Sequence, residues 1–201
     1  MGASEDHYAS VASSFDRRAS DYDDSAMHRG IARAVAEFVE LGGVDAVLDI
    51  ATGTGLVLRA LARRDARIRY FGIDISPGML AVARSELPYG TFVDGAAEEV
   101  PFEDSQFQLV TCVTALHLVS DPLAVFAEVA RVLAPGGRLA LATFQIPPGH
   151  PVVDRPYRTN HTAFETPALL EAIASPFGFT VTRSKVDQYG GDTCLITELS
   201  L

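Results

Sequence analysis

The stretch VLDIATGTG, Val47–Gly55, constrains the fold more than any other part of the chain. Its apolar residues predict a short buried strand, and Gly53 and Gly55 follow at once. The next residues, 56–64, have apolar positions at helical spacing, so the sequence predicts a strand, a tight turn and a helix. Because glycine has no Cβ, the turn can bend sharply and a ligand can lie against its backbone.

An acidic residue ends the next predicted strand. Asp74 lies about 20 residues beyond the turn, the spacing at which a carboxylate takes a ribose hydroxyl in this kind of unit. The third glycine of the dinucleotide fingerprint would fall on Leu58, which weakens the alternative of a nicotinamide oxidoreductase. No Gly-Lys-Ser/Thr follows the turn, so there is no P-loop. We therefore expect a nucleotide-like ligand of another kind.

The chain contains, in order, the segments VLDIATGTG, GIDISPGML, DGAAEEVPFEDSQFQLV and RVLAPGGRLALATF. In this order and spacing they resemble the motifs of the class I S-adenosylmethionine-dependent methyltransferases, most closely the small-molecule enzymes of the quinone-biosynthesis type. The resemblance is strong over residues 15–145. It implies a Rossmann-like, doubly wound α/β fold in a single domain, residues 1–201. Its mostly parallel seven-stranded sheet would have the strand order 3-2-1-4-5-7-6 and an antiparallel last strand.

Alternation of strands and helices agrees with a parallel, doubly wound sheet. Strands are predicted at residues 47–50, 68–74, 91–95, 107–116 and 138–144, with a final antiparallel pair at 177–186 and 192–199. Helices are predicted at residues 28–43, 56–64, 77–86, 122–133 and 166–175. APGG, residues 134–137, is the expected turn into the fifth strand.

Composition limits the partners. The chain has 201 residues, enough for one domain with a sizeable core, and a net charge of −10, which argues against general binding to nucleic acid or anionic membranes. Cys112 and Cys194 lie in apolar runs and are predicted to be buried free thiols; no metal-ligand spacing occurs. Without a visible secretory signal or apolar span, we expect a cytoplasmic monomer or homodimer that binds no metal.

The N-terminal segment carries a helical pattern over residues 13–25. Phe15, Ala19 and Tyr22 fall on one face of such a helix. The resemblance implies that this segment, within residues 1–27, forms a lid over the cofactor. The alternative is that Phe15 and Tyr22 simply pack on the domain.

The resemblance also implies a set of cofactor contacts to S-adenosylmethionine. Asp49 would lie near the methionine amino group, or would instead be a buried carboxylate that accepts backbone N–H groups. Asp74 would take the ribose hydroxyls. Ile75 and Met79 would pack on the adenine, although Met79 could equally be a core residue. The full expected set is Tyr22, Asp49, Ala51, Thr52, Gly53, Gly55, Asp74, Ile75, Met79, Ala96, Ala97 and Val113.

Two positions depart from the family pattern. Ala51 stands where the first motif usually has glycine, and a methyl group there is tolerable if φ is negative. Ala96 stands where the family usually has an acidic residue for the adenine amino group. Adenine would then rely on backbone groups of Ala96 and Ala97.

The expected reaction is methyl transfer from S-adenosylmethionine to an O, N or C atom of a small organic molecule. Holding the methyl donor and the acceptor in line can supply much of the rate acceleration. A general base is needed only when the acceptor atom keeps a proton at neutral pH. His117, after the fourth strand, is the candidate base, with a packed histidine as the alternative. Substrate contacts are expected from a loop at residues 145–165, namely from His150, Tyr157, Arg158 and His161. The rival reading is a non-catalytic or repurposed S-adenosylmethionine-binding protein of the same fold.

Overall fold

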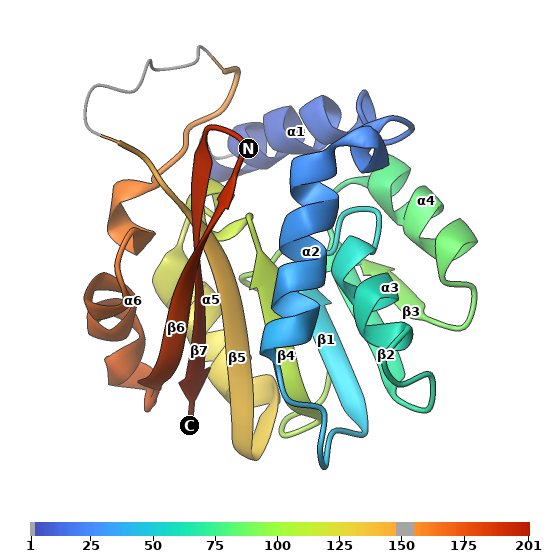
Figure 1. Ribbon diagram of the computed structural model, residues 1–201. Helices are drawn as coiled ribbons and strands as arrows, with labels where there is room; N and C mark the ends of the chain where they lie inside the picture. Colours follow the sequence, from blue (N-terminus) through green and yellow to red (C-terminus); the bar gives the residue numbers. More distant parts are fainter. Residues whose placement is uncertain (1–2, 148–154) are drawn as a thin grey trace.

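The computed structural model describes residues 3–147 and 155–201, which form three layers around one seven-stranded sheet (Figure 1). One face is covered by α2 (Ala26–Phe38), α3 (Leu56–Ala62) and α4 (Pro77–Glu86). The opposite face is covered by α5 (Pro122–Val132) and α6 (Pro167–Ala174). The remaining helix, α1 (Ala3–Asp16), lies across the end of the sheet at which the parallel strands finish.

The strand order is β3-β2-β1-β4-β5-β7-β6, which confirms the predicted order. The strands are β1 (Ala46–Ile50), β2 (Arg69–Asp74), β3 (Thr91–Asp94), β4 (Phe107–Val113), β5 (Leu133–Gln145), β6 (Thr180–Tyr189) and β7 (Asp192–Ser200). The first five pair in parallel, and β7 runs antiparallel to β5 and β6. The loops that follow β1, β2 and β4 therefore meet at one edge of the sheet, where ligands bind in folds of this kind.

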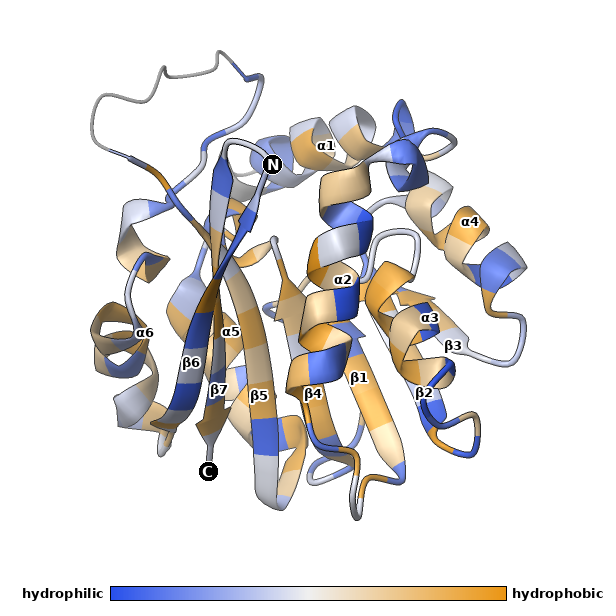
Figure 2. Cartoon of the chain, in the orientation of Figure 1, coloured by the Kyte–Doolittle hydropathy of each residue, from blue (hydrophilic) through white to orange (hydrophobic). Residues whose placement is uncertain are grey.

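The central strands form the core. All five residues of β1 are buried, and they alternate between the two faces: Val47 packs with α2 and α3, whereas Leu48 and Ile50 pack with α5. Figure 2 shows apolar residues concentrated in the central strands, while β6 at the edge is polar along much of its length. Cys112 and Cys194 are buried free thiols, as predicted. Within the described ranges, no helix is long and apolar enough to cross a membrane.

Helix starts follow the sequence signals closely. The side chains of Ser76, Asp121 and Thr166 each accept a backbone N–H from the first turn of α4, α5 and α6, respectively. A proline follows each of them at the start of the helix, where its missing N–H costs nothing.

The helix predicted over residues 13–25 is wrong. α1 ends at Asp16, and a short 3₁₀ helix, η1, occupies Tyr22–Asp24. The Asp16 carboxylate accepts hydrogen bonds from the Ser76 hydroxyl (2.6 Å) and the Gly78 N–H (2.8 Å). These bonds tie the end of α1 to the start of α4. Phe15 and Tyr22 do come together, with ring centroids 6.2 Å apart, but a turn between them brings this about and not a continuous helix.

Other predicted boundaries also differ. α2 ends at Phe38 rather than near Gly43, at the point where the Arg64 guanidinium donates to the carbonyl of Val39. β4 ends at Val113 rather than Leu116, because Thr114 takes a left-handed φ of 54° that turns the chain out of the strand. The turn predicted at residues 134–137 is an irregularity within β5, where the register against β4 shifts.

Candidate active site

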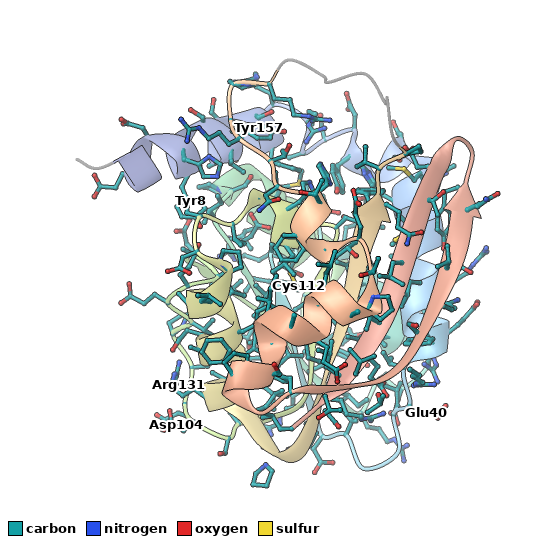
Figure 3. All side chains as sticks on the ribbon, turned by 90° about the vertical axis from the view of Figure 1, so that its left-hand side faces the viewer. Tyr8, Glu40, Asp104, Cys112, Arg131 and Tyr157 are labelled. Carbon is teal, nitrogen blue, oxygen red and sulfur yellow. The ribbon has the colours of Figure 1, made fainter. Side chains whose placement is uncertain are left out.

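Two adjoining hollows lie where β1, β2 and β4 end. The larger hollow measures about 670 Å³ and the smaller about 390 Å³, and both volumes include space open to solvent. They share the lining residues Tyr22, Ala51, Gly53, Val113 and Thr114. The larger hollow extends toward β3 and α1, and the smaller one toward α2 and the start of α3. In Figure 3, Tyr8, which lines the larger hollow, lies at the α1 end of the molecule, far from Glu40 and Asp104.

The loop after β1 forms the floor between the hollows. Ala51, Gly53 and Gly55 all have positive φ, at 54°, 55° and 78°. The condition of a negative φ at Ala51 is therefore not met, and its methyl group costs roughly 1–2 kcal/mol of backbone strain. Glycine relieves that strain, which is the physical reason for the family's usual residue. Backbone strain of this kind concentrates at functional sites.

Asp74 is bound to this loop. Its carboxylate accepts the N–H of Gly53 at 2.8 Å and the N–H of Ser76 at 2.9 Å. Burial raises the pKa of Asp74, against the effect of these N–H groups. Two carboxylate oxygens have about four acceptor positions, so the backbone N–H groups leave acceptor capacity for a hydroxyl group of a ligand.

Asp49 lies deeper, at the smaller hollow. It is 2% exposed, and its carboxylate accepts the Thr111 hydroxyl at 2.6 Å. Burial raises the pKa of Asp49 to about 7. A buried carboxylate is costly without a positively charged partner, and among the described residues Asp49 forms no ion pair. The alternative role of accepting backbone N–H groups is absent from the hydrogen bonds of the described residues.

Tyr22 stands between the two hollows. Burial raises the pKa of its phenol to about 12. Its ring stacks on His28, with centroids 4.3 Å apart and planes at 10°. The following residue, Asp23, accepts the Thr54 hydroxyl at 2.5 Å and pairs with Arg59, which ties this segment to the glycine loop and α3.

The N-terminal helix provides one wall of the larger hollow. Tyr8, Val11 and Phe15 line it from α1. The Tyr8 hydroxyl donates to Glu98, whose carboxylate also accepts the Ser120 N–H at 3.1 Å. Oε2 of Glu98 is buried and has no hydrogen-bond partner in the part of the chain that the structure describes. Together with the Asp16 contacts to α4, these bonds hold α1 against the site.

Most of the expected cofactor residues come together here. Ten of the twelve line one hollow or both: Tyr22, Asp49, Ala51, Thr52, Gly53, Asp74, Ile75, Met79, Ala97 and Val113. Gly55 lies outside the lining, where a Cβ would be 3.4 Å from the Ala83 side chain, so it serves the packing of the loop on α4. Ala96 also lies outside the lining.

His117 does not join these residues. It lies on a short 3₁₀ helix, η2 (Leu116–Leu118), where its ring stacks on His161 with centroids 4.0 Å apart. Burial, His161 and Arg155 together lower the pKa of His117 to about 3, which makes it a weak base. The turn at Thr114 carries this side chain away from the lining of the two hollows.

The expected substrate residues are also placed elsewhere. Tyr157 is buried beside Arg155, which donates to its hydroxyl at 3.2 Å, and Arg158 is exposed. Neither they nor His161 line the two hollows. His150 lies outside the described residues.

The sequence reasoning missed several lining residues. Tyr8 and Val11 continue the spacing of Phe15 at i, i+3 and i+7, a helical stripe that was available in residues 8–15. No sequence pattern pointed to Leu118 and Val119 as lining residues, because the turn after β4 is what brings them to the larger hollow. His28, at the smaller hollow, resembled any polar residue in the first turn of a helix.

Comparisons with known proteins show the family to which the chain belongs. Residues 48–141 match the family model described as methyltransferase domain. A demethylmenaquinone methyltransferase of Paenarthrobacter aurescens is 33% identical over 173 residues, which cover 82% of this chain and 66% of that protein. The chain belongs to the class I S-adenosylmethionine-dependent methyltransferase family. Another family member, a demethylmenaquinone methyltransferase of Renibacterium salmoninarum, is 38% identical over 123 residues, 61% of this chain.

The chain spans about half the length of that second methyltransferase, since the match covers 49% of it. Among solved structures, similarity extends over the whole chain for a Burkholderia thailandensis 1,6-didemethyltoxoflavin-N1-methyltransferase, solved with bound 1,6-didemethyltoxoflavin and S-adenosylhomocysteine. The TM-score is 0.81 at 19% identity, covering 100% of this chain and 91% of that one. This likeness confirms the methyltransferase fold.

Proposed function

We propose that this protein transfers a methyl group from S-adenosylmethionine to an O, N or C atom of a small, largely apolar molecule. The observation that carries the proposal is the pair of adjoining hollows, with Asp49 at the inner end of the smaller one and Asp74 beside the glycine loop in the larger one. A sulfonium nucleoside with an amino-acid tail is a long ligand with polar groups at both ends. The glycine loop between the hollows supports the middle of such a ligand.

The residues present fit this cofactor. Asp49 would receive the ammonium group of the methionine end, which would give the buried carboxylate its missing positive partner. Asp74 would receive the ribose hydroxyls with its remaining acceptor positions. Ile75, Met79 and Ala97 offer apolar contacts for adenine, and backbone groups of residues 96 and 97 would take the place of the acidic residue that Ala96 replaces.

The remaining part of the larger hollow is proposed to bind the methyl acceptor. Val11, Phe15, Leu118 and Val119 make this part apolar, which suits an acceptor with an aromatic or aliphatic body. The names of the curated relatives point to the same class of compound. We further propose that α1, within residues 1–27, is a lid that must loosen its contacts for ligands to exchange.

Bound S-adenosylmethionine would supply an electrophilic methyl group, so the protein's own contribution is chiefly alignment and exclusion of water. The apolar side chains of α1 and η2 would hold the acceptor against the groove. If the acceptor is a hydroxyl compound, its proton would pass to Oε2 of Glu98, which lines the hollow and has no hydrogen-bond partner among the described residues. Tyr8, whose pKa burial raises to about 12, would stay protonated and keep its bond to Glu98.

Methyl transfer is tested with methyl-labelled S-adenosylmethionine and an organic extract rich in quinols and phenols. The proposal predicts label in an organic-soluble product, and none with Asp74→Ala. Binding of S-adenosylhomocysteine without label transfer to any acceptor would instead support the rival of a repurposed cofactor-binding protein. Tighter binding of NADH than of S-adenosylhomocysteine would support an oxidoreductase.

A further inference from the structure

Glu98 lines the larger hollow from the segment that follows β3, and its two carboxylate oxygens differ in their contacts. Three donors meet Oε1: the Tyr8 hydroxyl, the Ser120 N–H at 3.1 Å and the Asp121 N–H at 3.2 Å. One oxygen of a carboxylate offers about two acceptor positions, so Oε1 has no capacity left. Because these donors come from α1 and from the start of α5, they fix the carboxylate from two directions.

The other oxygen has the opposite character. Oε2 of Glu98 is buried and has no hydrogen-bond partner among the described residues. A buried acceptor without a partner is costly, and the cost is larger for a charged group. A ligand with an O–H or N–H group beside Oε2 would remove this cost. An ether or a hydrocarbon would not, because it has no polar hydrogen to donate.

The lining of the larger hollow offers little to a negatively charged ligand. It holds two carboxylates, Asp74 and Glu98, and no Lys, Arg or His among the described residues. Its two phenol groups are engaged within the protein, since Tyr8 donates to Glu98 and Tyr22 bonds with the side chain of Thr114. An anionic ligand would therefore be repelled by like charge and would find no free phenol to bind it.

Two basic side chains contact residues of this lining without joining it. The Arg18 guanidinium lies 4.4 Å from the centre of the Phe15 ring. Nε2 of His7 bonds to the carbonyl of Leu118 at 2.8 Å. Both contacts hold α1 and its following turn in place, and the charged groups in the described lining remain the two carboxylates.

We propose that Glu98 selects the methyl acceptor by hydrogen bonding and by charge. The acceptor carries an O–H or N–H group that donates to Oε2, and it carries no carboxylate, phosphate or sulfate group at that end. The substrate class is thus a neutral or cationic hydroxy or amino compound with an apolar body. The inference rests on the proposed function, because it assumes that the acceptor occupies the larger hollow beside the cofactor.

Three naphthalene probes, substituted at the same ring position, test this selection on protein saturated with S-adenosylhomocysteine. Naphthol has a donor, methoxynaphthalene has none, and naphthoate carries a negative charge. Because the chain has no tryptophan, the fluorescence of the naphthalene ring can follow binding. The wild-type protein should bind naphthol about 10- to 100-fold more tightly than methoxynaphthalene, the effect of one hydrogen bond to a charged group. Naphthoate should bind most weakly.

Two matched variants locate the selection. Glu98→Gln keeps the size of the side chain but removes its charge, so it should bind naphthoate at least about tenfold more tightly than the wild-type protein does. Its preference for naphthol over naphthoate should shrink by the same factor or more. Glu99→Gln is the control, because Glu99 is the next residue, is exposed and does not line the hollow. It should keep the wild-type order of the three probes.

The outcomes separate this inference from the proposed function. If the wild-type protein binds naphthoate as tightly as naphthol, the selection is overturned, although the cofactor site stands. If Glu98→Gln keeps the wild-type ratio of the two Kd values, the role of Glu98 is overturned. Binding of S-adenosylhomocysteine but of none of the probes would overturn the larger hollow as the acceptor site. If the protein does not bind S-adenosylhomocysteine, the proposed function itself fails. Should Glu98→Gln not fold, the wild-type order of the three affinities still decides the question.

Discussion

Replacing Asp49 by asparagine should stabilise the ligand-free protein increasingly as the pH rises. The carboxylate is fully buried, and its pKa in the folded protein is about 7, against about 3.9 in an unfolded chain. The folded state therefore holds a proton that the unfolded state releases, and stability falls as the pH rises from about 4 to 7. Asparagine has no proton to lose, and its carbonyl can keep the hydrogen bond from Thr111.

The size of the effect follows from the two pKa values. Each pH unit between them costs the wild-type protein about 1.4 kcal/mol, or roughly 4 kcal/mol in all above pH 7. About 1.5 kcal/mol of that is already lost at pH 5. The free energy of unfolding of Asp49→Asn, relative to wild type, should therefore rise by about 2–3 kcal/mol between pH 5 and pH 8.

Urea unfolding at pH 5, 6, 7 and 8, followed by circular dichroism, measures this difference. Asp45→Asn is a matched control, because Asp45 is exposed and lies on the same chain segment. Its difference from wild type should stay flat. A flat or falling difference for Asp49→Asn would show that the buried carboxylate is not held at a raised pKa. The same variant should lose affinity for S-adenosylhomocysteine, so that a gain in stability accompanies a loss of binding.

Other substitutions test further parts of the site. Ala51→Gly should stabilise the protein by about 0.5–1 kcal/mol in urea unfolding, since relief of the positive φ exceeds the added flexibility of the unfolded chain; a loss above 1 kcal/mol would contradict the strain. Asp74→Ala should weaken binding of S-adenosylhomocysteine by about 1.5–3 kcal/mol in calorimetry, and an unchanged Kd would remove it from the site. With a hydroxyl acceptor, Glu98→Gln should lower turnover by about 10²–10⁴-fold, whereas His117→Ala should change it less than about threefold; the reverse order would restore His117 as the base.

Much of the fold could be predicted because its signals are local. The apolar run of β1, the glycines after it and the caps at Ser76 and Asp121 each fix a strand, turn or helix start within a few residues. The strand order came from the family resemblance, and the pairing confirms it. The carboxyl ends of the parallel strands β1 and β2 then bring Asp49 and Asp74 to two adjoining hollows.

The rest depended on single backbone angles and on distant contacts. The positive φ of Ala51 has no sequence signal, because alanine rarely takes that conformation. At Thr114 one left-handed residue decides whether the next side chains enter the hollow, and it takes His117 away while Leu118 enters. The wall formed by α1 depends on Asp16 reaching α4, a contact between residues about 60 positions apart.

Titration calorimetry of the wild-type protein with S-adenosylhomocysteine measures directly whether the groove binds the cofactor. We expect one bound molecule per chain, with affinity lost in Asp49→Asn and Asp74→Ala but not in Asp45→Asn. Saturable binding that all three variants share equally would place the ligand elsewhere. No binding at millimolar ligand would contradict the assignment of the groove to S-adenosylmethionine and, with it, the proposed methyl transfer.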